Sequence, residues 1–228
     1  MYFRLKVIVL LLLFKGLLTH QAATAQDADT GNWLMYFGNQ AINDRWNWHN
    51  EIQYRSYNFI GDTEQLLLRT GIGYNLSERN NNLLLGYGYI HSQPYLTNGL
   101  KKAKMDEHRI FQQFINRHAL GRVYIQHRLR AEERFLPDGF KIRGRYFVSL
   151  NIPLNQSTVT KNSLYVSAYN ELFVNAQDNL FDRNRVYAGL GYGFHRAIRV
   201  EAGMMSQIYS NGHRNQLQLG FYNNLPLR

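Results

Sequence analysis

The chain of 228 residues has no cysteine and only four prolines. Without cysteine it can form no disulfide, and it offers no residue for the lipid anchor of a lipoprotein. Beyond the first 25 residues, no stretch places apolar residues at a sustained helical period. These absences exclude a disulfide-linked scaffold and direct attention to strands.

Recognisable catalytic and cofactor motifs are missing as well. The sequence has no glycine-rich phosphate loop, no cysteine-based metal site, no His-Glu-x-x-His and no Gly-x-Ser-x-Gly motif. We therefore expect no cofactor, no metal ion and no enzymatic activity. The enzymatic alternative is a lipid-hydrolysing barrel with a Ser–His pair near its rim, for which His91, Ser92 and His118 are available.

The first 25 residues have the pattern of a secretory signal peptide. Arg4 and Lys6 form a basic start, residues 7–18 are mostly apolar, and small residues then precede a cleavage site after Ala25. The alternative, a retained anchor helix, is disfavoured because the apolar run is short and a lysine interrupts it. We expect residues 26–228 to form one exported domain.

The mature chain is basic. Lys and Arg total 26 against 16 acids, and the signal holds three of the cations, which leaves 23 against 16 and an excess of +7. A basic excess can indicate a nucleic-acid partner. Here the cations alternate with apolar residues instead of forming a run, and an exported chain rarely meets nucleic acid. We expect no nucleic-acid partner.

Alternation with a period of two is the most informative pattern, and residues 122–134 show it best. Their even positions include Arg128, Arg130, Glu132 and Arg134, whereas their odd positions are mostly apolar. Such alternation predicts a strand with one polar and one apolar face. Because the pattern recurs along nearly the whole chain, the apolar faces supply too much surface for one small core. We infer that they meet lipid while the polar faces line a closed barrel.

Eleven segments show this alternation to some degree. They are residues 33–39, 45–57, 64–76, 83–91, 107–118, 122–134, 141–151, 164–175, 185–195, 199–209 and 215–225. Bacterial single-chain barrels have an even number of strands. We predict an all-β, antiparallel transmembrane β-barrel of 10 to 12 strands, with ten strands from Arg45 onward and both ends in the periplasm. The segment 33–39 would then lie inside as a plug or pair with an unrecognised twelfth strand.

Charged residues on the polar faces would meet in the lumen. The candidate network consists of Glu51, Arg55, Arg69, Glu107, Arg109, Arg128, Arg130, Glu132, Arg134, Arg143, Arg145, Glu171, Arg185, Arg199 and Glu201. One interpretation is structural, because ionised groups in a narrow barrel must be paired or hydrated. The other is an anion-selective constriction or an anionic-ligand site, because arginines outnumber acids. We favour the structural interpretation.

Several segments resemble a known family. Besides the aromatic opening Trp33-Leu34, they are WNWHNEIQYR at 46–55, QLLLRTGIGY at 65–74 and HRLRAEERF at 127–135. On these residues the chain resembles the family catalogued as domain of unknown function 2490, over nearly the whole mature chain. The resemblance implies an outer-membrane β-barrel of Bacteroidetes-type bacteria and implies no activity.

These patterns together predict a non-enzymatic protein of the outer membrane. It would be structural, or it would pass or bind a small, anionic solute, with outer-membrane lipid around it. Besides the lipid hydrolase, the alternative is a soluble periplasmic β-barrel binding protein. That alternative requires the inverse facing, with Leu217 and Phe221 buried and Arg130 and Arg134 in water.

Overall fold

The computed structural model describes residues 30–77, 80–96, 99, 101–177 and 179–227, so the predicted signal peptide at 1–25 lies outside the described residues. None of the described residues forms a helix that could cross a membrane. The strands are β1 (Gly31–Ala41), β2 (Trp46–Ser56), β3 (Thr63–Asn75), β4 (Asn81–Ser92), β5 (Met105–Leu120), β6 (Val123–Leu136), β7 (Gly139–Pro153), β8 (Ser163–Asn175), β9 (Phe181–His195), β10 (Ile198–Tyr209) and β11 (Gly212–Asn223).

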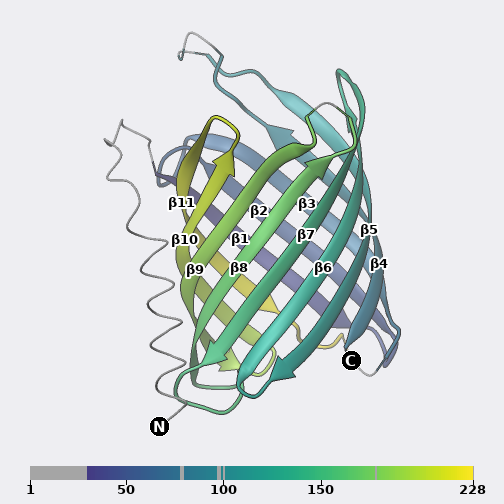
Figure 1. The fold of residues 1–228 in the computed structure, drawn as a ribbon, viewed down its shortest axis with the longest axis vertical. Helices are drawn as coiled ribbons and strands as arrows, with labels where there is room; N and C mark the ends of the chain where they lie inside the picture. The colour runs from purple at the N-terminus through teal and green to yellow at the C-terminus, as the bar shows by residue number, and fades with distance from the viewer. Residues whose placement is uncertain (1–29, 78–79, 97–98, 100, 178, 228) are drawn as a thin grey trace.

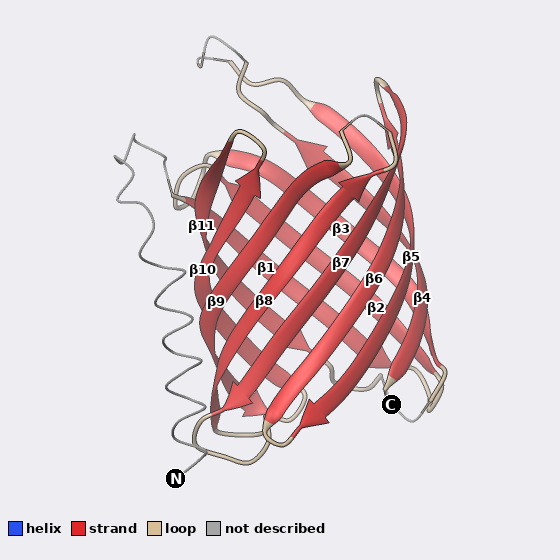
Figure 2. Ribbon diagram, in the orientation of Figure 1, coloured by secondary structure: helices blue, strands red, loops and turns tan. Residues whose placement is uncertain are grey.

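The eleven strands close into one barrel of strongly tilted strands (Figures 1 and 2). Each strand pairs antiparallel with the next along the chain, from β1–β2 to β10–β11. The barrel closes where β1 pairs in parallel with β11, and Trp33 lies opposite Gln218 there. A purely antiparallel barrel needs an even number of strands, and this one parallel pair allows an odd number.

The predicted barrel of 10 to 12 strands is confirmed at eleven, mostly antiparallel, but the expectation of an even number is wrong. Segment 33–39 is neither a plug nor the partner of a twelfth strand, because it belongs to β1, between β2 and β11. The physical reason is the open backbone of an edge strand, which offers unpaired donors and acceptors. A ten-stranded sheet from β2 to β11 has two such edges, and β1 pairs with both.

The odd number of strands also separates the two ends of the described chain. Residue 30 lies at the rim that carries the links 57–62 and 210–211, which we call the loop rim. Residues 224–227 follow β11 at the opposite rim, with the turn 121–122, which we call the turn rim. The prediction of a barrel that begins at Arg45, with both ends on one side, is therefore wrong.

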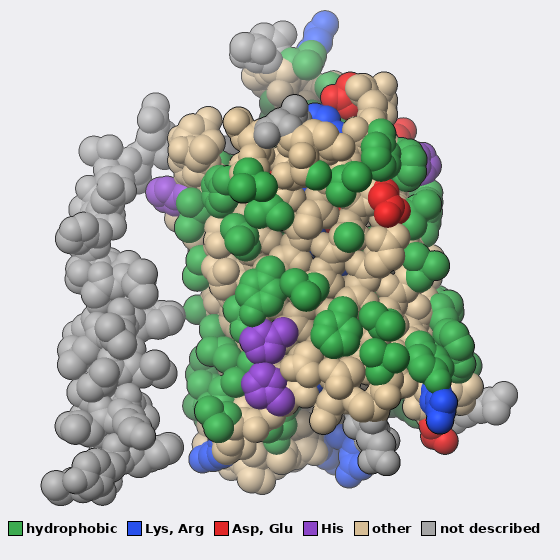
Figure 3. Space-filling model, turned by 45° about the vertical axis from the view of Figure 1, so that its right-hand side comes forward, with side chains coloured by type: hydrophobic (Ala, Val, Ile, Leu, Met, Phe, Trp, Pro, Cys, Tyr) green, Lys and Arg blue, Asp and Glu red, His purple; other side chains and the backbone are tan. Residues whose placement is uncertain are grey.

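Side chains alternate across the barrel wall, with apolar groups outside and polar groups inside. Ile52 is 49% exposed on the outer wall, whereas Arg130 is 4% exposed in the interior. Figure 3 shows hydrophobic side chains spread over the outer surface, with Lys and Arg mainly at its two ends. The soluble alternative required the opposite facing, but Phe221 is 40% exposed, so its expected facing is wrong.

Two inward-facing glycines of β4 differ in how closely the interior approaches them. A Cβ on Gly86 would lie 2.3 Å from Cζ of Phe111, whereas a Cβ on Gly88 would lie 3.2 Å from the flexible Cγ of Arg69. We expect Gly86→Ala to lower the free energy of unfolding by about 1–3 kcal/mol, because the buried ring has no room to move. Gly88→Ala is the matched control and should cost clearly less in urea unfolding of the refolded protein. Equal losses would contradict this account.

Candidate functional site: the charged interior of the barrel

The structure places all fifteen predicted network residues on the inner face of the barrel. Arg128, Arg134 and Arg199 are partly exposed. The other twelve are buried: Glu51, Arg55, Arg69, Glu107, Arg109, Arg130, Glu132, Arg143, Arg145, Glu171, Arg185 and Glu201. They come from eight of the strands, β2, β3 and β5 to β10. Alternation brings them together, because every second residue of a tilted barrel strand points to the same lumen.

Glu132 on β6 is the most connected residue of this network and is 0% exposed. Its Oε1 accepts a hydrogen bond from Nη1 of Arg145 at 2.6 Å, and its Oε2 accepts one from Nη2 of Arg143 at 2.6 Å. Its guanidinium neighbours within 4 Å are Arg69, Arg109, Arg130, Arg143 and Arg145. A single carboxylate thus has five cations around it, and no water-exposed surface is left between them.

Glu171 and Glu51 extend the network to both sides. Oε1 of Glu171 accepts hydrogen bonds from Arg128 at 2.7 Å and from Arg145 at 2.6 Å. Oε1 of Glu51 accepts one from Nη1 of Arg69 at 2.6 Å. Because Arg145 binds both Glu132 and Glu171, and Arg69 lies beside both Glu51 and Glu132, the ion pairs continue from β2 across the lumen to β8.

Glu107 lies toward the loop rim and binds two arginines. Arg109 donates to its two carboxylate oxygens at 2.6 and 2.8 Å. Arg134 donates to the same two oxygens at 2.5 and 3.0 Å. Such two-point contacts fix the orientation of both planar groups, and they hold β5 and β6 in register at this end of the lumen.

Glu201 lies toward the turn rim and is held mostly by hydroxyl groups. Tyr165 donates to its Oε1 at 2.9 Å, and Ser167 and Tyr222 donate to its Oε2 at 3.1 Å. Arg199 lies 3.5 Å from the same carboxylate and 4.2 Å from the ring centroid of Tyr222. This end of the lumen is therefore more polar and less charged than its middle.

Aromatic rings on the inner face support the arginines, and sequence reasoning missed them. The Arg130 guanidinium lies 4.5 Å from the ring centroid of Phe111, and those of Arg145 and Arg185 each lie 4.5 Å from that of Phe173. Stacking on a ring face stabilises a buried cation. The available signal was parity, because Phe111 shares the parity of Arg109 and so lies on the polar face of β5.

The residues considered for lipid hydrolysis are not brought together. His91 faces outward and its Nδ1 lies 2.7 Å from Oδ1 of Asp106, whereas Ser92 is buried inside and accepts a hydrogen bond from Gln65. His118 stacks on a neighbouring histidine. Within the described part of the chain, no hydrogen bond joins a serine hydroxyl to a histidine ring, and no group of three or more His, Asp or Glu could hold a metal ion.

Two links at the loop rim contact one another. Lys102 forms an ion pair with Asp62 and donates to the carbonyl oxygen of Thr63 at 2.7 Å. The rings of Tyr57 and Tyr95 lie 5.1 Å apart beside it. The hydrogen bond from Lys102 lowers the pKa of the Asp62 carboxyl. These contacts join the link after β2 to the link after β4.

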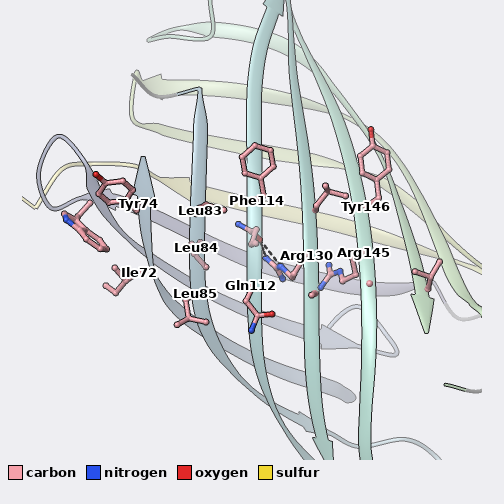
Figure 4. A pocket seen from close by; sticks show the side chains of 16 residues that line it. Ile72, Tyr74, Leu83, Leu84, Leu85, Gln112, Phe114, Arg130, Arg145 and Tyr146 are labelled. Carbon is pink, nitrogen blue, oxygen red and sulfur yellow. Dashed lines mark hydrogen bonds between the residues drawn. The ribbon is translucent and has the colours of Figure 1, made fainter. Parts of the chain in front are cut away.

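A separate concavity lies in the outer wall. It has a volume of about 890 Å³ and an almost entirely apolar lining, with Leu83, Leu85 and Ile72 among the residues in Figure 4. Ala131 has a short side chain and Gly144 has none, so the outer surface is hollowed at this place. Outward-facing Gln112 lines it too and donates to the carboxylate of Glu133 at 3.2 and 3.3 Å.

A family model described as "Protein of unknown function (DUF2490)" matches residues 30–218, which covers all strands except the end of β11. No curated protein matches the chain.

Proposed function

Because this chain belongs to the DUF2490 family, whose description assigns no activity, we propose from its geometry that it is an outer-membrane β-barrel closed by its internal ion network. Its role is non-enzymatic. It is a structural protein or it binds a small anion, and it is not an open pore. The predicted signal peptide exports it, and outer-membrane lipid surrounds it.

The apolar outer wall supports the location in a membrane. Large side chains such as Ile52 on β2, Leu129 on β6 and Leu190 on β9 are about half exposed at different places around the barrel. Soluble proteins rarely expose continuous apolar surface of this extent, because it drives association in water. Backbone groups are paired between neighbouring strands all around the closed sheet, which is the condition for crossing a hydrocarbon layer with strands.

The single observation that supports a closed interior is the environment of Glu132, which is fully buried and has five guanidinium groups within 4 Å. A passing solute would have to separate these groups. Removing one partner of a buried ion pair leaves an uncompensated charge, which costs several kcal/mol. A path through the network would therefore open rarely, and steady flow of ions is not expected.

Conductance of the refolded protein in a planar lipid bilayer tests this proposal. We expect no stable current steps in 1 M salt, because the ion pairs fill the lumen. Insertion must be shown independently, by the folded mobility shift in unheated gels and by resistance to protease in vesicles. Stable steps from inserted protein would overturn the closed interior, and failure to insert into any lipid would overturn the membrane location.

A further inference from the structure

Among the described residues, several hydrogen-bond donors lack partners on the inner face of the seam where the barrel closes. The seam joins β11, β1 and β2, and Trp33 lies opposite both Gln218 and Arg55 in the pairing register. The register places inward-facing side chains of these three strands next to one another. We call this region the seam site and define it by Trp33, Arg55, Arg214, Gln216 and Gln218.

Arg55 is a cation without a carboxylate partner. It is buried, and its two terminal nitrogens donate to the amide oxygens of Gln65 at 2.7 Å and Gln53 at 2.6 Å. Among the described residues, no carboxylate lies within 4.0 Å of it, and its Nε has no hydrogen-bond partner. The buried arginines at the middle of the network, by contrast, all lie within 4.0 Å of a glutamate.

A second cation lies close to the same place. The Arg55 guanidinium lies 3.8 Å from the ring centroid of Trp33, and that of Arg185 lies 4.8 Å from it. Trp33 is 2% exposed, and its indole Nε1 has no hydrogen-bond partner. Arg185 is paired with Glu171 at 3.5 Å, so the charge left without a close carboxylate at this ring is that of Arg55, and the indole offers a free N–H donor.

Gln216 and Gln218 add amide donors from β11. Gln216 is 0% exposed, and neither its Nε2 nor its Oε1 has a partner; Gln218 uses its Oε1 to accept from Tyr169, which leaves its Nε2 unpartnered. Gly31 lies opposite Gln216 and has no side chain, and Nη2 of Arg214 occupies the space beside it. This Nη2 has no hydrogen-bond partner among the described residues, whereas Nη1 of the same arginine forms an ion pair with Glu64 at 3.0 Å. Burying amides without partners is costly, so an occupant that accepts hydrogen bonds is expected.

We propose that the seam site binds a small inorganic anion of the size of a halide or nitrate. The site offers N–H donors from an indole, two amides and two guanidinium groups. Glu64 is the ion-pair partner of Arg214, whereas Arg55 has no carboxylate within 4.0 Å among the described residues, so its positive charge is the one left to an anion. A water molecule would accept two hydrogen bonds at most and would leave the charge uncompensated. The ligand must be small, because Trp33, Gln216 and Gln218 are almost fully buried and Arg55 is only 8% exposed.

This inference deepens the proposed function, because it rests on the closed interior and names the anion class that the interior holds. Fluorescence can read the site directly. The chain has three tryptophans, and Trp46 and Trp48 are on the outer wall. The double variant Trp46→Phe, Trp48→Phe therefore leaves Trp33 as the only indole, at the seam site.

Iodide is the probe, since it binds at anion sites and quenches indole fluorescence. In folded protein in detergent, at constant ionic strength set with gluconate, we expect a saturable loss of Trp33 emission that chloride competes away. Adding Arg55→Gln should weaken the apparent affinity about tenfold or more, because a charge-assisted contact is lost. Arg117→Gln is the matched control: Arg117 is a half-buried interior arginine on β5 that binds Gln126, and its loss should change nothing.

The possible results separate the two proposals. Quenching that rises linearly with iodide and is unchanged by Arg55→Gln would overturn the seam site. Neutral acrylamide tests the closed interior independently, because a buried indole is quenched poorly. Ready quenching by acrylamide in folded protein would overturn the closed lumen whatever iodide does.

A second variant keeps the test decisive if Arg55→Gln fails to fold. Chloride should raise the unfolding temperature of the unsubstituted protein relative to gluconate at equal ionic strength, because a ligand that binds only the folded state stabilises it. Gln216→Leu should fold and reduce this shift. No chloride-dependent shift in the unsubstituted protein, or an equal shift in Gln216→Leu, would overturn the seam site.

Discussion

The Glu132→Gln variant should lose about 3–5 kcal/mol of the free energy of unfolding, the usual cost of removing one partner from a buried ion pair. The substitution keeps the shape of the side chain and removes its negative charge. Five guanidinium groups then remain within 4 Å of a neutral amide. Their mutual repulsion, at a place without solvent-exposed surface, is the physical reason for the loss. Urea unfolding of refolded protein in vesicles measures it.

Glu133 provides the matched control. It is the next residue on the same strand, but it faces the outer wall, where Gln112 is its hydrogen-bond donor. Glu133→Gln makes the same chemical change and should leave stability equal or higher, because a charge on an apolar, lipid-facing wall is unfavourable. If the two variants lose equal stability, the assignment of inner and outer faces on β6 is wrong.

Ile52→Arg should destabilise the barrel in a bilayer by about 2–4 kcal/mol, the cost of a cation at the lipid-facing midplane of a membrane barrel. Ile52 lies in the middle of β2, points outward, and has Tyr36 and Leu68 as its register neighbours. In a protein surrounded by water, an arginine at an exposed position would be nearly neutral. Equilibrium unfolding in phosphatidylcholine vesicles distinguishes the two environments.

Leu180→Arg is the control for this second variant. Leu180 is more exposed than Ile52 but lies in the link between β8 and β9, beyond the ends of the strands. Its substitution should leave stability within experimental error. An unchanged free energy of unfolding in Ile52→Arg would count against lipid around the wall. A large loss of stability in Leu180→Arg would show that arginine is harmful at any exposed position and would remove the argument.

The facing of the strands could be predicted from the sequence because alternation is a local property. Arg128, Arg130, Glu132 and Arg134 share one parity, and any strand that contains them must point them to one side. The same reasoning placed the other network residues on the inner face. It did not place Phe111 and Phe173, because an apolar residue of inward parity looks like a defect in the pattern until the arginine that stacks on it is known.

Pairing and closure could not be predicted, since both depend on the register of the whole sheet. Glu132 lies near Arg69 and Arg109, which are on other strands. These contacts follow from the tilt and stagger of all eleven strands. The expectation of an even number of strands was wrong for a related reason. A rule drawn from purely antiparallel barrels could not accommodate β1, whose partner on one side, β11, runs in the same direction.

The parallel seam also bears on the order in which the barrel folds. Every other strand pair joins two strands that are consecutive in the chain. Their residues are close in sequence, so they meet early and at little entropic cost. At the seam, Trp33 meets Gln218 across nearly the whole described chain. Loop-closure entropy therefore makes the β1–β11 contact the last to form, and it sets the rate of folding more than any hairpin does. An open sheet of eleven strands, with β1 and β11 as its two unpaired edges, is the expected late intermediate, and the pairing of β1 with β11 closes it.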